Sequence, residues 1–189
     1  FNLLYGHIDS IIITLTRDTT EVGIYGLAYK VFEVVLVFPT FFMNAVYPIM
    51  LKAREEKGRF FRIIKNSFLL LLVTSLFSSL LLWFAAPLLT SIQEGFTASV
   101  PALRVLSLSL PFFFVSALTM WTLITLKKQL LLVIVYGSTM LMNVLFNAWL
   151  IPTGGYMAAA WITVASEGIV FAVSGAIVLR LLRTNNREI

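Results

Sequence analysis

The sequence is a succession of apolar runs, each long enough to cross a membrane, separated by short polar or turn-forming breaks. A helix needs about 20 apolar residues to cross a hydrocarbon core about 30 Å thick. With 59% hydrophobic and only 12% charged residues, the chain has too little polar surface for a water-soluble globule, which carries about 25% charged residues. We therefore predict an all-α integral membrane protein with about six transmembrane helices. The predicted spans are Phe1–Thr16, Val22–Leu51, Ser67–Ile92, Ala102–Leu126, Leu130–Ile151 and Tyr156–Leu182.

The breaks between the spans carry their own structural signals. Pro152 to Gly155 (Pro-Thr-Gly-Gly) combines two strong helix breakers and predicts a tight turn. Pro39 and Pro48 lie inside the second span and predict a kinked helix, because proline removes a backbone donor and clashes with the preceding turn. The basic linker over 52–65 has apolar residues at helical spacing in its second half, which favours a short helix lying in the membrane interface.

The basic residues are distributed unequally between the two sides of the predicted bundle. Of the 14 Lys and Arg residues, all but Arg17, Lys30 and Arg104 lie after the second or fourth span or at the C-terminal end. Positive-inside orientation then places these loops, and both ends of the chain, in the cytoplasm. The expected location is the cell (inner or plasma) membrane. The net charge of +5 is then explained by the basic loops that orient the helices in the membrane, and no nucleic-acid partner is expected.

The chain reads as one transmembrane helical domain over residues 1–189. It begins with Phe1 and lacks the basic region and cleavage site of a signal peptide, so we interpret it as a fragment of a longer protein. It contains no Cys and one His, which leaves no disulfide framework and no usual zinc site, and no metal or cofactor is expected. No catalytic or phosphate-binding motif is present, and the loops are too short for a soluble catalytic domain. A transporter is favoured over an enzyme.

Ionisable residues at membrane depth are the strongest functional candidates, because each costs about 2.5–3.5 kcal/mol at mid-bilayer. Lys30 and Glu33 are three residues apart and can pair on one helix face. One interpretation is a buried structural salt bridge. The other is that Lys30 attracts an anionic substrate headgroup while Glu33 sets its charge. We expect Tyr25 and Tyr29 to extend the same face with hydroxyls and rings that suit sugars.

Asp9 lies inside the first apolar run with no basic neighbour in its own helix. It either pairs with Lys30 on the next span or binds a coupling proton or sodium ion. Glu167 lies in a stretch of small residues and favours hydrogen bonding between helices. Asn143 and Asn147 share a face at i, i+4, and serve either as contacts between helices or as cavity lining.

Several segments together resemble a known transporter family. Members often have an Asp in a first apolar run, a Val-Gly-x-Tyr segment, and a Pro-x-x-Gly turn into a helix rich in small residues. The corresponding segments here are Ile8–Ile12, Val22–Lys30, Phe38–Pro39, Tyr47–Met50 and Leu150–Ala160. The chain resembles the polysaccharide transporter (Wzx-type) flippases of the multidrug/oligosaccharidyl-lipid/polysaccharide (MOP) superfamily. This superfamily also contains the MATE drug exporters and the lipid II flippases.

The resemblance implies a protein of about twelve to fourteen helices, in two lobes around a central cavity. The chain would form much of the C-terminal lobe, and its partners would be membrane lipid, a lipid-linked glycan and the remaining half of the same transporter. The implied function is to flip a lipid-linked oligosaccharide to the outer leaflet by alternating access. By their positions, Lys30 and Arg104 are the basic residues best placed to meet a diphosphate. The alternatives are a MATE-type cation-coupled multidrug exporter and a lipid II flippase.

Overall fold

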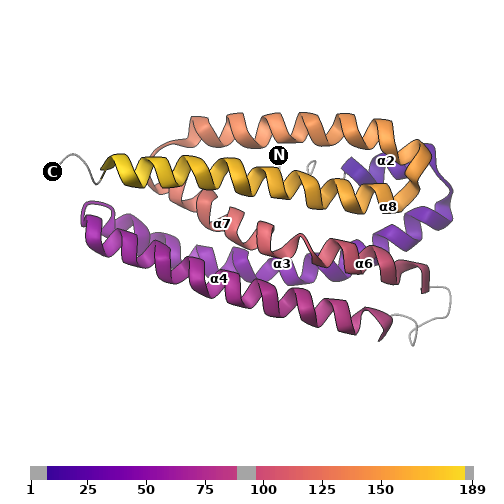
Figure 1. The fold of residues 1–189 in the computed structure, drawn as a ribbon, viewed down its shortest axis with the longest axis horizontal. Helices are drawn as coiled ribbons and strands as arrows, with labels where there is room; N and C mark the ends of the chain where they lie inside the picture. Colours follow the sequence, from indigo (N-terminus) through magenta and orange to yellow (C-terminus); the bar gives the residue numbers. More distant parts are fainter. Residues whose placement is uncertain (1–7, 89–96, 186–189) are drawn as a thin grey trace.

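A computed structural model describes residues 8–88 and 97–185 of the chain, and every regular element in these residues is a helix. Figure 1 shows long helices running nearly parallel to one another. The helices are α2 (Ile8–Thr16), α3 (Thr19–Ala53), α4 (Lys57–Ala85), a 3₁₀ turn η1 (Ala86–Leu88), α6 (Ser99–Ser107), α7 (Leu110–Thr125) and α8 (Gln129–Asn185).

Helix α8 consists of two antiparallel arms (Figure 1). The chain reverses at Gly155, whose φ of 61° and ψ of −156° interrupt the helix. That backbone conformation is essentially restricted to glycine. The turn predicted at Pro152–Gly155 is therefore present, and the two arms correspond to the fifth and sixth predicted spans.

Three helices are long and apolar enough to cross a membrane: Thr19–Ala53, Lys57–Leu88 and Gln129–Arg183. A fourth is obtained if α6 and α7, which are bent by 43° relative to each other, count as one broken span. Since α8 doubles back, the described helices follow the predicted spans from the second to the sixth. Helix α2 covers the second half of the first predicted span, whose residues 1–7 lie outside the described residues. The predicted all-α membrane fold is confirmed.

Helix α4 corrects one sequence-based expectation. The linker over 52–65 does not contain a separate interfacial helix, because α4 begins at Lys57 and continues unbroken for 29 residues. No proline or glycine follows Gly58 in this helix, so nothing interrupts its hydrogen bonding. At 1.5 Å per residue α4 is about 43 Å long, longer than a hydrocarbon core of about 30 Å. The length of α4 leaves room for its basic first turns to lie outside the hydrocarbon region, where charged side chains are not costly.

Proline residues explain where the chain breaks near α6 and α7. Pro111 lies in the first turn of α7, and its missing N–H leaves the carbonyl of Ser107, four residues earlier, without a helical donor. Ser79 of α4 supplies a donor instead, with its Oγ 2.7 Å from the Ser107 carbonyl oxygen. Ser107 is fully buried, and a buried carbonyl without a partner is costly. A side chain of the neighbouring helix thus satisfies a buried carbonyl at the break in the span.

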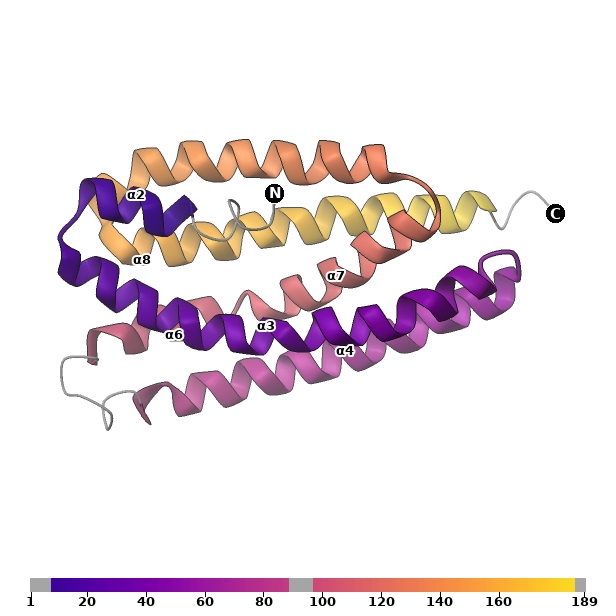
Figure 2. The same cartoon turned by 180° about the vertical axis from the view of Figure 1, so that it is seen from behind.

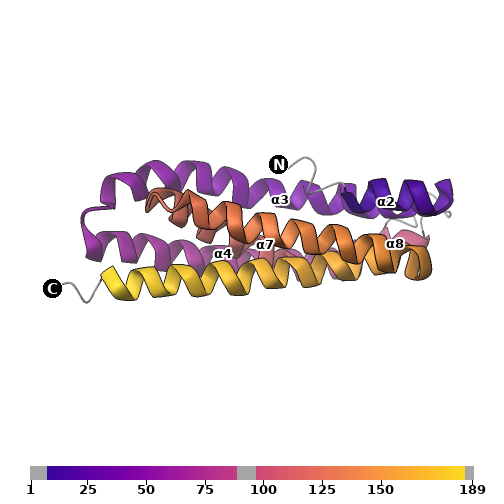
Figure 3. The ribbon, with the colours of Figure 1, turned by 90° about the horizontal axis from the view of Figure 1, so that it is seen from above.

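The helices form a flattened bundle with α7 in the middle (Figures 1 and 3). Helices α3 and α4 lie on one side of α7 and the two arms of α8 lie on the other, as Figure 2 also shows from behind. Buried side chains such as Phe32 and Phe114 fill the centre. Large apolar side chains also cover the outside: Phe84 is 76% exposed and Trp149 is 73% exposed. Such a surface fits lipid or further helices, not water.

The basic segments gather at one end of the bundle. The α3–α4 turn, the α7–α8 turn and the end of α8 lie together, opposite the α2–α3 turn and the turn between the two arms of α8 (Figures 1 and 2). This grouping agrees with the alternation of loops expected from the sequence. That this end faces the cytoplasm remains a prediction from its charge.

Candidate functional site

A cavity of about 260 Å³ lies between α2, α3, α7 and both arms of α8. Its wall combines apolar side chains, such as Leu36 and Phe113, with a larger number of polar ones. The polar groups on the wall are Asp9, Tyr29, Glu33, Thr40, Ser116, Tyr136, Asn143, Thr163 and Glu167. Because polar groups are expensive inside a membrane, a concentration of them around one cavity indicates a functional site.

Asp9 is held in the first turn of α2 and is only 5% exposed. The hydroxyl of Tyr25, from α3, donates a hydrogen bond to Asp9 Oδ2, and the backbone N–H of Ser10 donates to Oδ1 at 2.8 Å. Tyr25 itself is fully buried. The carboxyl group is therefore fixed between α2 and α3 with access to the cavity.

Helix α3 presents one face to the cavity. Tyr25, Tyr29 and Glu33 follow each other at intervals of four residues, so their side chains lie on one stripe of the helix. The rings of Tyr25 and Tyr29 pack with their centroids 5.7 Å apart. Tyr29 and Glu33 line the cavity, whereas Tyr25 lies behind Asp9. The structure thus brings together four of the residues that the sequence singled out, including Asp9.

Lys30 lies outside this arrangement. The expectation that Tyr25 and Tyr29 share its face is wrong, because consecutive residues on a helix point about 100° apart and Lys30 is exposed while both tyrosines are buried. Within the described residues Lys30 forms no ion pair with Asp9 or Glu33. Its side chain does not line the cavity. The two structural pairings considered for Lys30 are therefore not present.

Arg104 has a structural role at the C-terminal end of α4. Pro87 removes the N–H that would otherwise bond to the carbonyl of Trp83, and Arg104 Nε lies 3.3 Å from that carbonyl oxygen. The Arg104 guanidinium also lies over the Trp83 ring, 5.5 Å from its centroid. Helices α4 and α6 thus each supply a side-chain donor to a carbonyl that a proline leaves without its partner.

The two arms of α8 are joined by a buried polar chain. Asn147 Nδ2 donates to Asn143 Oδ1 at 2.8 Å, and Asn143 Nδ2 donates to Ser166 Oγ at 3.0 Å. Asn143 also lines the cavity, so both sequence-based interpretations hold for this residue. Glu167, next to Ser166, is 2% exposed and lies on the cavity wall.

Several residues of the cavity wall are not predicted from the sequence. The surroundings of Glu167 in the sequence predict that it bonds between helices, although a charge at membrane depth is itself a signal for a functional site. Tyr136, Ser116 and Thr163 gave no signal, because a single hydroxyl in an apolar run is common. No Lys or Arg lines the cavity in the described part of the chain. Among residues 8–88 and 97–185, no group of three or more His, Cys, Asp or Glu side chains lies close enough together to hold a metal ion.

Comparison with known proteins identifies the family. A family model described as MatE matches residues 1–149, from the start of the sequence to near the end of the first arm of α8. The chain belongs to the MatE family. Members are membrane transporters of the MOP superfamily, not enzymes, and the bundle described above fits one lobe of a MATE-like fold. Neither a curated protein nor a solved structure matches the chain.

Membership of a transporter family bears on how the polar cavity is interpreted. In a transporter, polar side chains at membrane depth mark the path of the substrate or of the coupling ion. The matched residues include the cavity residues of α2, α3, α7 and the first arm of α8. Thr163 and Glu167, on the second arm, complete the wall from outside the matched region.

Proposed function

We propose that this MOP-superfamily transporter flips a lipid-linked oligosaccharide from the cytoplasmic to the outer leaflet by alternating access. In this proposal the chain forms much of the C-terminal lobe, and the cavity wall receives the glycan. The observation that carries the proposal is the mixture of aromatic rings, hydroxyls, carboxylates and the Asn143 amide around one cavity. Sugars offer many hydroxyls and flat apolar ring faces, which such side chains bind by hydrogen bonds and stacking.

In this proposal, two faces of α3 bind different parts of the substrate. Tyr29 and Glu33 face the cavity and contact the glycan, and Tyr25 packs against the ring of Tyr29. Lys30 lies on the exposed side, one helical turn from Glu33, and contacts the anionic diphosphate as the substrate passes. Arg104 contributes less to this contact, because its guanidinium is already bonded to Trp83.

Asp9 is the proposed ion-coupling residue. Its carboxyl group is nearly buried, lies on the cavity wall and is oriented by Tyr25. A carboxylate in this position changes its net charge when it binds a proton or a sodium ion. That change in charge at membrane depth can shift the balance between two conformations of the transporter.

A second function is favoured by one specific observation. Asp9, Glu33 and Glu167 all line the cavity, and no Lys or Arg does so among the described residues. A carboxylate-lined and aromatic cavity also suits a cationic drug. A MATE-type cation-coupled multidrug exporter is therefore the alternative. A lipid II flippase would use several basic residues facing one cavity, which the described residues do not provide.

The test uses source cells that lack the gene and are then re-supplied with the complete protein. The flippase proposal expects loss of surface glycan and cytoplasmic accumulation of lipid-linked oligosaccharide, both reversed on re-supply. Normal glycan with increased sensitivity to cationic drugs would instead support the exporter. Accumulation of lipid II would support the third candidate.

The role of Lys30 is tested in the same cells. Lys30→Ala should abolish glycan export without reducing the amount of protein in the membrane, because Lys30 contributes no ion pair to the described fold. The matched control is Lys65→Ala, which removes an exposed lysine at the basic end of α4 and should leave export intact. Normal export by Lys30→Ala would exclude the proposed diphosphate contact.

A further inference from the structure

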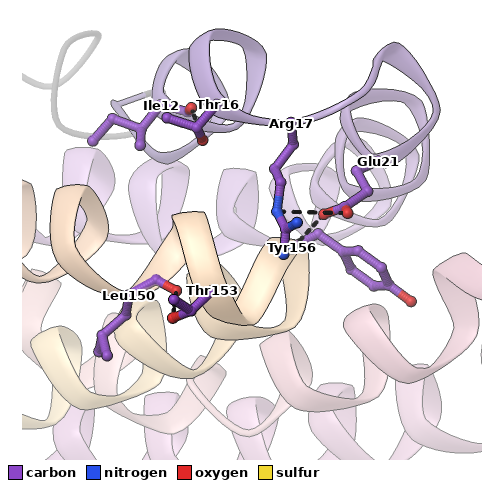
Figure 4. Close-up of polar contacts among 7 residues, drawn as sticks. All are labelled: Ile12, Thr16, Arg17, Glu21, Leu150, Thr153 and Tyr156. Atoms are coloured by element: carbon purple, nitrogen blue, oxygen red, sulfur yellow. Dashed lines mark hydrogen bonds and ion pairs between the residues drawn. The ribbon is translucent and has the colours of Figure 1, made fainter.

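At the end of the bundle away from the basic loops, one carboxylate connects two turns of the chain. Glu21, in the first turn of α3, accepts a hydrogen bond at Oε2 from the backbone N–H of Tyr156, 3.1 Å away. The donor and the acceptor are 135 residues apart in the sequence. Figure 4 shows the Glu21 carboxylate joined by dashed lines to Arg17 and to Tyr156. The α2–α3 turn is thereby tied to the α8 turn.

The Tyr156 N–H is one of the donors that a helix leaves unsatisfied at its start. The second arm of α8 begins directly after Gly155, so its first N–H groups have no intrahelical acceptor. A carboxylate at a helix start satisfies such a donor and interacts favourably with the helix dipole. Glu21 therefore performs for α8 the role of a capping residue, although it belongs to a distant helix.

Arg17 and Gly155 complete the arrangement. Arg17 Nε lies 3.6 Å from Glu21 Oε1, which orients the carboxylate toward the α8 turn. A Cβ atom on Gly155 would lie 2.6 Å from Glu21 Oε2 and 3.1 Å from Arg17 Nη2. Only a residue without a side chain allows this close approach. The glycine thus both turns the chain and makes room for the carboxylate.

This contact bears on the cavity because Asp9 lies on α2. Asp9 lines the cavity and is only 5% exposed, so its carboxyl group is placed by α2. The position of α2 depends in turn on its neighbours: Asp9 bonds to Tyr25, and directly after the end of α2 Arg17 pairs with Glu21.

We propose that Glu21 is a positioning residue that holds α2, and with it Asp9, in register with the second arm of α8. Through Arg17 and Tyr156, α2 and α8 are fixed to each other at the outer end. Asp9 then keeps its place on the same cavity wall as Thr163 and Glu167. The proposal is independent of whether a glycan or a drug is transported.

The test is hydrogen–deuterium exchange of the complete protein in lipid nanodiscs. Loss of a cap is worth about 0.5–2 kcal/mol, so Glu21→Ala should accelerate exchange roughly 2- to 30-fold, both at the start of the second α8 arm and throughout Ile8–Thr16. Glu21→Gln keeps an amide oxygen for the Tyr156 N–H but loses the charge that pairs with Arg17, so it should restore most of the protection at the α8 turn and part of it in Ile8–Thr16. The matched control, Glu56→Ala, breaks an exposed Arg59 ion pair at the basic end and should leave α2 unchanged.

Three outcomes would overturn the proposal. The first is faster exchange at the α8 turn with unchanged exchange in α2, which would make Glu21 a local cap only. The second is equal loss of α2 protection in Glu21→Ala and Glu21→Gln, which would exclude the hydrogen bond to Tyr156 as its cause. If Glu21→Ala does not fold, Arg17→Gln replaces it. That variant should accelerate exchange in Ile8–Thr16 more than at the α8 turn, and unchanged exchange in Ile8–Thr16 is the third contradicting outcome.

Discussion

At the scale of single residues, Gly155 has the most restricted position. Its φ of 61° with ψ of −156° lies in a region essentially restricted to glycine, and Glu21 occupies the space where a side chain would begin. Both constraints act on the same atom, Cβ. The reversal of α8 and the contact between two distant turns therefore depend on the absence of that atom.

Gly155→Ala is expected to destabilise the protein by about 1–3 kcal/mol through backbone strain, with the clash against Glu21 adding to the loss. Gly175→Ala is the matched control in the same helix: its new Cβ would meet no atom within 4 Å. It should be neutral or stabilising by up to about 1 kcal/mol. Thermal unfolding in detergent measures both variants. Equal stability of the two would contradict the described turn.

The Asp9 carboxyl group offers a second prediction at this scale. Asp9→Asn keeps an oxygen that accepts the Tyr25 hydroxyl, so its thermal stability should stay close to that of the unmodified protein. It removes the negative charge, so transport driven by a cation gradient should fall at least about tenfold if Asp9 couples the ion. Transport assays in vesicles with and without the gradient measure the effect. A normal gradient-driven rate would exclude Asp9 from coupling.

At the scale of helices, two prolines set the geometry of α4, α6 and α7. Pro87 lies directly after α4, and Pro111 lies at the start of α7, next to the break from α6. Each proline leaves the carbonyl four residues earlier without its helical donor. The donors come reciprocally from the partner helix: Ser79 of α4 bonds to Ser107, and Arg104 of α6 bonds to Trp83. The bent pair α6–α7 is therefore bonded to α4 on both sides of the contact.

Ser79→Ala tests this reciprocal arrangement. It leaves the buried Ser107 carbonyl without the Ser79 hydroxyl and should cost about 1–3 kcal/mol of stability. Ser138→Ala is the matched control, because the exposed Ser138 hydroxyl bonds only to a carbonyl of its own helix, and it should change stability by less than about 0.5 kcal/mol. Thermal unfolding compares them. A similar, small effect of both substitutions would mean that the Ser79 bond contributes little.

At the scale of the whole molecule, the distribution of charge over the fold predicts one orientation in the membrane. The α3–α4 turn, the α7–α8 turn and the end of α8 lie at one end of the bundle and carry most of the basic residues (Figure 1). Arg17, at the opposite end, is instead paired with Glu21. Positive-inside orientation then places the basic end in the cytoplasm.

Labelling of introduced cysteines tests this orientation, because residues 1–189 contain none. A membrane-impermeant maleimide added to intact cells should label Asp18→Cys in the α2–α3 turn and should not label Lys128→Cys in the α7–α8 turn until the cells are permeabilised. Both positions are exposed, so accessibility within the fold does not distinguish them. The reverse labelling pattern would invert the orientation.

The sequence by itself determined the fold class, the approximate spans and the turn at Gly155. Apolar run length and strong helix breakers are local properties, and lipid demands that each span satisfy its own backbone. It also identified Asp9, Tyr29 and Glu33, because their polar groups are expensive at membrane depth.

Only the tertiary structure decided which polar groups face one another. Glu167 joins the cavity wall, Lys30 lies outside it, and Arg104 and Ser79 bond to carbonyls of neighbouring helices. In the same way, Glu21 reaches a backbone N–H that lies 135 residues away. Local sequence does not encode these contacts, because they depend on how each helix is rotated about its axis, and that rotation is set by the packing of all its neighbours.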